Sequence, residues 1–183
     1  MTRSVTEGVP KRVFLVGFSG SGKSTVGKKL AGLLGWSFVD VDAVIAAKEH
    51  RSVPCIFAAG GERYFRRLER QEIERAVRRK GRAIIALGGG AFQSGANRLM
   101  IRRAGTVVYL SCSAREIIRR LRKLSNRPML EGADSRKKRV QELLRNRKPY
   151  YSLADMTIRT TGKAPARVVR EIRIMLMRCR DAR

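Results

Sequence analysis

Residues 12–25 read RVFLVGFSGSGKST, a short apolar run that ends in a glycine-rich loop. The run is rich in Val and Leu and stops at Gly17, which predicts a buried strand. The loop fits the pattern G-x-x-x-x-G-K-[ST], and the apolar spacing that follows it predicts a helix closed by Gly35. A strand, this loop and a helix in succession form a phosphate-binding site for a nucleoside triphosphate.

The residue types of the loop indicate how the phosphates are held. Glycines allow backbone N–H groups to converge on phosphate oxygens, and the helix N-terminus adds its positive end. Lys23 is expected to reach the β- and γ-phosphates, and the Ser24 hydroxyl to ligate Mg²⁺. The predicted nucleotide-binding residues of the loop are Gly20, Ser21, Gly22, Lys23, Ser24 and Thr25.

Strand and helix patterns alternate along the rest of the chain. Further strands are predicted at 37–42, 82–90, 106–111 and 155–160, and helices at 61–80, 113–123, 134–151 (stopped near Pro149) and 164–180. This alternation predicts an α/β fold of three αβα layers around a five-stranded parallel sheet. We expect one domain over 1–183, with a substrate-binding region at about 41–80 and a mobile lid at about 124–135.

Composition narrows the class of protein. No apolar run approaches the ~20 residues of a membrane helix, and the first residues lack the apolar core of a secretory signal, so we expect no membrane and a cytoplasmic location. Three scattered cysteines and one histidine argue against a disulfide framework or a zinc site. The 41 basic and 15 acidic residues give a net charge of +26, which favours polyanions; solvated helix faces are the simpler interpretation. A nucleic-acid partner is therefore not expected.

Two carboxylates follow the second predicted strand. In an open α/β sheet, ligands bind beyond the carboxyl ends of the strands. Asp40 and Asp42 are two apart, so on an extended chain both would point to the same side. One would serve Mg²⁺ and the other would accept a hydroxyl hydrogen bond as a general base. The alternative is a pair of caps for the next helix.

The helix at 61–80 carries a carboxylate on its apolar stripe. Glu69 falls among Phe65 and Ile73, and Arg66 lies one turn away at the stripe's edge. A buried carboxylate needs a partner, and Arg66 is spaced to provide it. An arginine fixed in this way binds a carboxylate or phosphate through two parallel bonds; the alternative is an arginine extended into water.

Three more features follow later strands. Gly88, Gly89 and Gly90 end the strand at 82–90 and permit close approach of a ligand to the backbone, although a plain loop would look the same. Arg127 in the predicted lid and Arg147 before Pro149 are each able to offset phosphate charge. Because arginine is abundant in this chain, neither position alone is diagnostic.

Taken together, these segments resemble the shikimate kinase family, P-loop small-molecule kinases with the nucleoside monophosphate kinase-like fold. The resemblance covers residues 12–160 and runs through GFSGSGKST, FVDVD, RSVPCIF, GERYFRRLE, LGGGA, NR, VVYL, RPML and RKPYY, in the family's order. It implies transfer of the ATP γ-phosphate to the 3-hydroxyl of shikimate, on the route to chorismate and aromatic amino acids.

The resemblance also implies roles for particular residues. Catalysis would involve Lys23, Asp42 and Arg127, and Mg²⁺ would lie near Ser24 and Asp40. Arg120 would pack on adenine, and Glu69 would orient Arg66. Shikimate would be bound by Asp42, Arg66, Gly88, Gly89, Gly90 and Arg147. The expected protein is a monomer with ATP and Mg²⁺ as cofactors.

The chain departs from the family pattern in its substrate-binding region. Cys55 stands where the family usually has an acid, Ala46 where a Glu is common, and His50 where a Gly is common. The lid reads RPML in place of RPLL. None of these positions is an expected contact. A kinase of another carboxylated polyol, such as gluconate, and a basic P-loop protein that binds nucleic acid are the alternative functions.

Overall fold

The structure is a computed structural model that describes residues 11–124 and 133–181. Five parallel strands form one sheet, as the sequence predicted. Their order in the sheet is β2-β3-β1-β4-β5. The elements in chain order are β1 (Arg12–Val16), α1 (Lys23–Leu34), β2 (Ser37–Asp40), α2 (Val41–Lys48), α3 (Val53–Arg78), β3 (Ala83–Ala86), the 3₁₀ helix η1 (Ala91–Gln93), α4 (Gly95–Ala104), β4 (Thr106–Ser111), α5 (Ala114–Leu124), α6 (Ala133–Tyr151), β5 (Met156–Arg159) and α7 (Pro165–Asp181).

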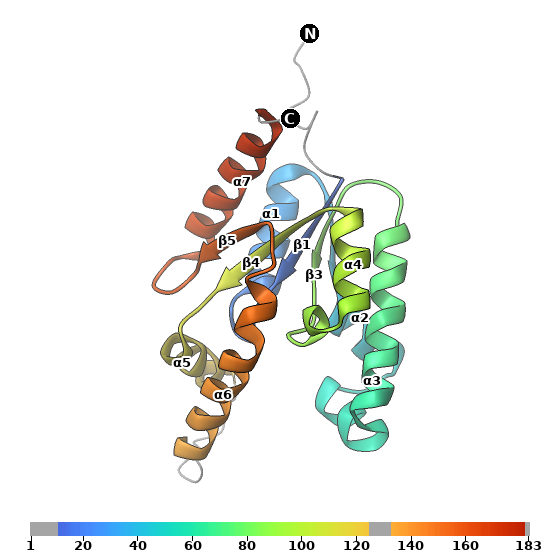
Figure 1. The fold of residues 1–183 in the computed structure, drawn as a ribbon, viewed down its shortest axis with the longest axis vertical. Helices are drawn as coiled ribbons and strands as arrows, with labels where there is room; N and C mark the ends of the chain where they lie inside the picture. Colours follow the sequence, from blue (N-terminus) through green and yellow to red (C-terminus); the bar gives the residue numbers. More distant parts are fainter. Residues whose placement is uncertain (1–10, 125–132, 182–183) are drawn as a thin grey trace.

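The central strand β1 supplies side chains to two separate cores. Successive strand residues point to opposite faces, so Val13 and Leu15 pack with α1 and α7. Phe14 and Val16 pack on the other face, in a cluster that includes residues of α3 and α4. Figure 1 shows these helix pairs on the two faces of the sheet. Because all of β1 after Arg12 is buried, the strand carries no polar side chain there.

The strand order changes direction at β1, and this determines where ligands can enter. The chain leaves β1 for β2 and β3 on one side, then crosses to β4 and β5 on the other. A crevice therefore opens at the carboxyl end of β1. Helices α5 and α6 lie beyond this end of the sheet (Figure 1), packed together around Phe18 and Ile117.

Several sequence-based boundaries were wrong, for local physical reasons. The strand predicted at 37–42 ends at Asp40, whose side chain caps α2, so Asp42 lies in a helical turn and not on extended chain. Helix α3 begins at Val53 and bends at Gly61 (φ 72°, ψ 177°), a conformation open essentially only to glycine. Helix α6, in contrast, ends at Tyr151 as predicted, with Pro149 in its last turn.

Helices α2, η1 and α4, and the segment of α3 before Gly61, were not predicted. The apolar spacing in α2 is weak because its eight residues are mostly Ala and Val. Ser113 caps α5, because its hydroxyl accepts from the Glu116 N–H at 3.4 Å. The Glu116 carboxylate binds Arg119 and Arg120. The predicted lid falls largely on 125–132, outside the described residues.

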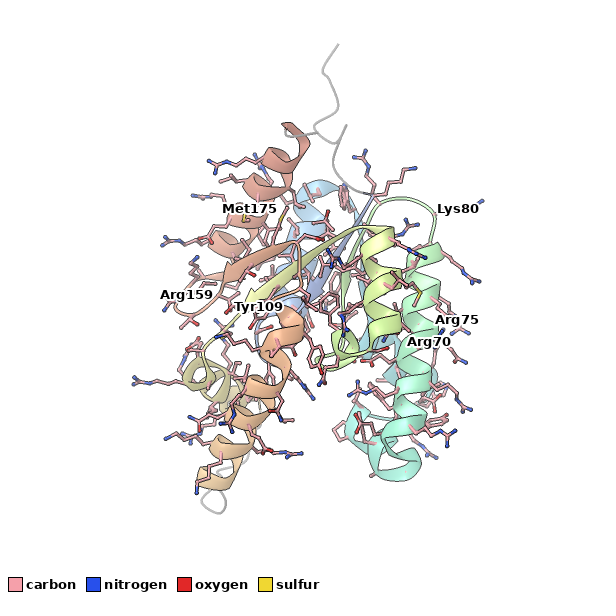
Figure 2. The ribbon with its side chains drawn as sticks, in the orientation of Figure 1. Arg70, Arg75, Lys80, Tyr109, Arg159 and Met175 are labelled. Atoms are coloured by element: carbon pink, nitrogen blue, oxygen red, sulfur yellow. The ribbon has the colours of Figure 1, made fainter. Side chains whose placement is uncertain are left out.

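Basic side chains lie on the outer faces of the helices. Figure 2 shows Arg70 and Arg75 along α3 and Lys80 just beyond it, directed away from the sheet. Arg70 pairs with Glu74 and Arg75 with Glu72. Among the described residues, no helix is long and apolar enough to cross a membrane.

His50 lies in the left-handed region with φ 50°. For an L-residue this conformation costs about 1–2 kcal/mol, and glycine avoids the cost at the expense of some chain entropy. His50→Gly should therefore raise the free energy of unfolding by roughly 0.5–1 kcal/mol, measured by urea denaturation. His50→Ala keeps a Cβ atom and therefore the conformational cost, so its free energy of unfolding should not increase. Equal increases from both variants would contradict the explanation.

Candidate active site

The loop between β1 and α1 forms a tight phosphate cradle. Gly22 caps α1 in a left-handed conformation (φ 102°), which a Cβ would disfavour. Gly17 is pressed against the chain, since a Cβ there would lie 2.7 Å from the Leu110 carbonyl oxygen. The Ser21 side chain is buried, and its hydroxyl has no hydrogen-bond partner among the described residues. These features place backbone N–H groups at a helix N-terminus, where anions bind.

Lys23 is held inside the cradle. Its ammonium group donates to the carbonyl oxygens of Gly17 and Phe18 at 2.9 and 3.1 Å. Burial lowers the pKa of Lys23 to about 8, while the carboxylates of Asp42 and Asp40 oppose this shift. The ammonium group therefore lies between the cradle and both acidic side chains.

A cavity of about 1060 Å³ extends from the cradle in two directions, which is ample for a nucleotide. One end reaches Asp42, Val53 and Leu87, and the other reaches Arg120 and Lys163. All six predicted nucleotide-binding residues from Gly20 to Thr25 line it. The cavity thus joins the phosphate cradle to the acidic residues that follow β2.

Ser24 and Asp40 meet at the floor of this cavity. The Ser24 hydroxyl donates to Asp40 Oδ2 at 2.5 Å, and Asp40 Oδ1 accepts from the Ala43 N–H at 3.3 Å. A hydroxyl and a carboxylate are hard oxygen donors of the kind that Mg²⁺ prefers. The described residues contain no cluster of three or more metal-ligating side chains. A P-loop Mg²⁺ takes most of its ligands from phosphates and water.

Asp42 lies in the first turn of α2 with one oxygen unpartnered. Its Oδ1 is buried and accepts no hydrogen bond from the described residues. Burial raises the pKa of Asp42, with Asp40 adding to the shift and Lys23 and Arg66 opposing it. A carboxylate that lacks a donor in this position is suited to accept one from a ligand.

The glycines after β3 leave room for the charged side chains around them. A Cβ on Gly88 would overlap Glu69 Oε1 and lie 2.7 Å from Asp42 Oδ1. A Cβ on Gly90 would overlap the Arg66 guanidinium group. Charged groups from α2 and α3 thus approach the backbone of this loop directly, which a side chain would prevent.

Arg66 is fixed by two carboxylates. Its Nη1 donates to Glu69 at 2.8 Å and its Nη2 to Glu62 at 3.0 Å, so the proposed pair with Glu69 is present. Glu69 is fully buried, and burial raises its pKa although Arg66 opposes the shift. The extended, solvent-directed alternative for Arg66 does not hold.

Arg147 approaches the same loop from α6. Its guanidinium carbon lies 5.4 Å from the centre of the Phe18 ring, and its Nη1 would be 3.2 Å from a Cβ on Gly89. Its Nε is buried without a partner among the described residues. Two arginines from different helices therefore flank three glycines.

Arg120 binds the back of the cradle. It donates to the carbonyl oxygens of Ser21 at 3.2 Å and Thr160 at 3.0 Å, and its Nε donates to Glu116 at 2.8 Å. The guanidinium group thus connects α5, the cradle and the end of β5 while lining the cavity. Arg127 lies outside the described residues.

Sequence reasoning missed three side chains that hold predicted ones in place. Glu62 precedes Arg66 by four residues and Glu116 precedes Arg120 by four, a helical spacing that identifies both pairs. Tyr151 also contacts the glycine loop, and no spacing in the sequence indicates it. The site residues that were predicted, apart from Arg127, lie together around the carboxyl ends of β1, β2 and β3.

A parallel sheet with this cradle, an adjoining acidic pair and two arginines beside the glycine loop defines a P-loop phosphotransferase for a small anionic acceptor. A sequence model of the family described as shikimate kinase matches residues 19–177. The chain belongs to the shikimate kinase family. It is 41% identical over 165 residues to the shikimate kinase of Moorella thermoacetica, covering 90% of this chain and 94% of that protein.

Further relatives agree with this assignment. The shikimate kinase of Halorhodospira halophila is 43% identical over 164 residues, covering 89% of this chain and 92% of the relative. The structure of a shikimate kinase from Acinetobacter baumannii in complex with shikimate matches with a TM-score of 0.84 at 33% identity, covering 94% of this chain and 96% of that one. A gluconokinase from Sinorhizobium meliloti matches with a TM-score of 0.63 at 19% identity, which shows the shared fold alone.

Glu116 makes the stability of the nucleotide end depend on pH. Hydrogen bonds from Arg119 and Arg120 lower the pKa of Glu116 from 4.5 to about 2. The folded state therefore gains stability from ionised Glu116 above pH 4.5 and loses it as the pH falls toward about 2. Glu116→Gln should lower the free energy of unfolding at pH 7, and the difference from the unmodified chain should shrink below pH 4.5.

Urea denaturation at pH 7, 4 and 3 measures this difference. Glu142→Gln is the matched control, since in the part of the chain that the structure describes Glu142 pairs only with the exposed Arg139, at 3.4 Å. Glu142→Gln should change the free energy of unfolding at pH 7 by less than about 0.5 kcal/mol. A Glu116→Gln difference that is constant over these pH values would refute the assigned ion pair.

Proposed function

We propose that this chain transfers the γ-phosphate of ATP to the 3-hydroxyl of shikimate, forming 3-phosphoshikimate and ADP. The observation that carries the proposal is the convergence of Asp42, Arg66 and Arg147 on the glycine loop, beside Lys23. Two guanidinium groups suit a carboxylated acceptor, and the carboxylate of Asp42, which lacks a donor on one oxygen among the described residues, suits its hydroxyl groups. The bound shikimate of the Acinetobacter baumannii relative supports the same acceptor.

In this proposal the phosphate cradle positions the ATP phosphates and supplies positive charge. Backbone N–H groups of residues 20–25 hold the phosphates, and Lys23 offsets charge on the transferring phosphoryl group. Mg²⁺, held by Ser24 and by Asp40 directly or through water, would neutralise phosphate charge when bound. Arg120 lies at the adenine side, and Arg127 is assigned to the transferring phosphate on the family resemblance alone.

At the acceptor end, Asp42 accepts the proton. The acceptor oxygen attacks the γ-phosphorus, the bond from that phosphorus to the ADP oxygen breaks, and the hydroxyl proton passes to Asp42. Burial of Asp42 strengthens its attraction for a proton, whereas Lys23 keeps the carboxylate available. Arg66 and Arg147 bind the acceptor carboxylate, and the backbone of Gly88–Gly90 contacts the ring hydroxyls.

The wider expectations from the sequence belong to this proposal. They are one kinase domain, a cytoplasmic monomer and a basic surface that takes no nucleic acid. The lid role of residues about 124–135 rests on the family resemblance. Gluconate is the competing acceptor, because paired arginines suit any small carboxylate.

The deciding experiment is acceptor-dependent ADP release. The purified chain is assayed with ATP and Mg²⁺ plus shikimate, gluconate or no acceptor in a coupled assay. Turnover with shikimate at least a hundredfold above both other reactions is expected. Turnover of gluconate without shikimate would overturn the proposal.

Arg66→Lys tests the acceptor end separately. Lysine keeps the charge beside Glu69 but loses the planar pair of donors, so the KM for shikimate should rise at least tenfold while the KM for ATP stays within twofold. Arg63→Lys, an exposed position one turn earlier, is the matched control and should leave both constants unchanged. Equal increases in both KM values for Arg66→Lys would reject its role in binding the acceptor.

A further inference from the structure

The loop from Gly88 to Gln93 has every backbone carbonyl bound within the protein. Gly88 and Gly90 accept from the N–H groups of Ala91 and Gln93, at 3.1 and 3.0 Å. Side chains bind the other four. The bonds are Asn97 Nδ2 to Ala91 at 3.1 Å, Arg98 Nη1 to Phe92 at 2.9 Å and to Gln93 at 2.7 Å, and the Tyr151 hydroxyl to Gly89 at 2.5 Å.

The N–H groups of the same three glycines show the opposite pattern. The N–H groups of Gly88, Gly89 and Gly90 donate to no acceptor among the described residues. Buried backbone donors are rarely left unpaired, and Gly88 and Gly90 are buried. The loop thus keeps its carbonyls within the protein and leaves a row of donors for a ligand.

Tyr151 is the side chain that binds the glycine part of this loop. It is the last residue of α6, fully buried, with its ring stacked on Tyr109 at 5.0 Å between centres. Figure 2 shows Tyr109 beside the end of α6. Burial raises the pKa of Tyr151 to about 12, so the hydroxyl stays protonated and able to donate at working pH.

The hydrogen bond acts on a specific peptide group. The Gly89 carbonyl and the Gly90 N–H belong to the same planar unit, so a donor on one end fixes the direction of the other. It also polarises the unit and strengthens the N–H as a donor. Consecutive glycines have no side chains to restrict them and lose the most entropy on ordering, so this loop needs an external support.

We propose that Tyr151 is a positioning residue for the acceptor, whose hydroxyl orients the Gly89–Gly90 peptide so that the Gly90 N–H is presented to the bound acceptor. Tyr151 lies one helical turn after Arg147 on α6. The end of α6 therefore positions both the Arg147 guanidinium group and the Gly90 N–H of the acceptor site. This inference rests on the proposed function of the site.

Tyr151→Phe tests the inference because it removes one oxygen and retains the stacked ring. The KM for shikimate should rise roughly fivefold to tenfold, as expected for loss of one hydrogen bond, with the KM for ATP within twofold. Tyr109→Phe is the matched control: it makes the same change on the stacked partner, whose hydroxyl donates no hydrogen bond among the described residues. That variant should leave both constants unchanged.

A second control separates orientation of one peptide from general loosening of the loop. Asn97→Ala removes the hydrogen bond to Ala91 at the far end of the same loop, and thermal unfolding should show a loss of stability. Its KM for shikimate should change less than that of Tyr151→Phe. An equal or larger change would overturn the assignment of Tyr151.

A readout that needs no acceptor completes the test. In protein labelled with ¹⁵N-glycine, the Gly90 amide resonance should shift in Tyr151→Phe and stay in place in Tyr109→Phe; an unmoved resonance in Tyr151→Phe would overturn the inference. The two proposals fail differently. An unmodified chain that does not turn over shikimate overturns the function, whereas normal turnover with identical KM values for both Phe variants overturns only the role of Tyr151.

Discussion

The buried ion pair between Glu69 and Arg66 is the constraint on which the acceptor end depends. An unpaired carboxylate in the protein interior is costly, so Glu69 holds the guanidinium group in one place. Glu69 and Arg66 then occupy the space where side chains on residues 88 and 90 would be. A side chain at either position would have to displace this pair. The charge pair on α3 therefore favours glycine in a loop on another element.

Positive and negative groups alternate across the site from the cradle to α6. Lys23 lies near Asp40 and Asp42, Asp42 lies near Glu69, and the two arginines enclose the acidic groups. Burial pushes the pKa of Lys23 down and that of Asp42 up, while each opposes the shift of the other. The pKa values of Lys23 and Asp42 therefore respond to added charge, and binding of a phosphate or a carboxylate changes both. Such coupling is useful where a proton leaves the acceptor as a phosphoryl group arrives.

Local sequence predicted those parts of the protein that depend on near neighbours. The strand, cradle and helix of residues 12–35 were correct because glycine positions and a helix N-terminus are properties of contiguous chain. The Arg66–Glu69 pair followed from helical spacing. Asp42 was misplaced because capping of α2 by Asp40 ends the strand two residues early, and a carboxylate at that point fits a strand or a cap equally well. The end of the helix containing Pro149 was predicted correctly, because a proline is tolerated in a final turn but does not allow the helix to continue far.

The sequence by itself determined the phosphate cradle, the five strands along the chain, and the family to which the chain is similar. Only the tertiary structure decided which residues meet at the acceptor end. The Tyr151 hydroxyl reaches a carbonyl 62 positions earlier, and α2, α3 and α6 meet at one loop. No local pattern encodes such contacts, because they arise when parallel strands bring their carboxyl ends to one edge and the helices between them pack on a shared sheet.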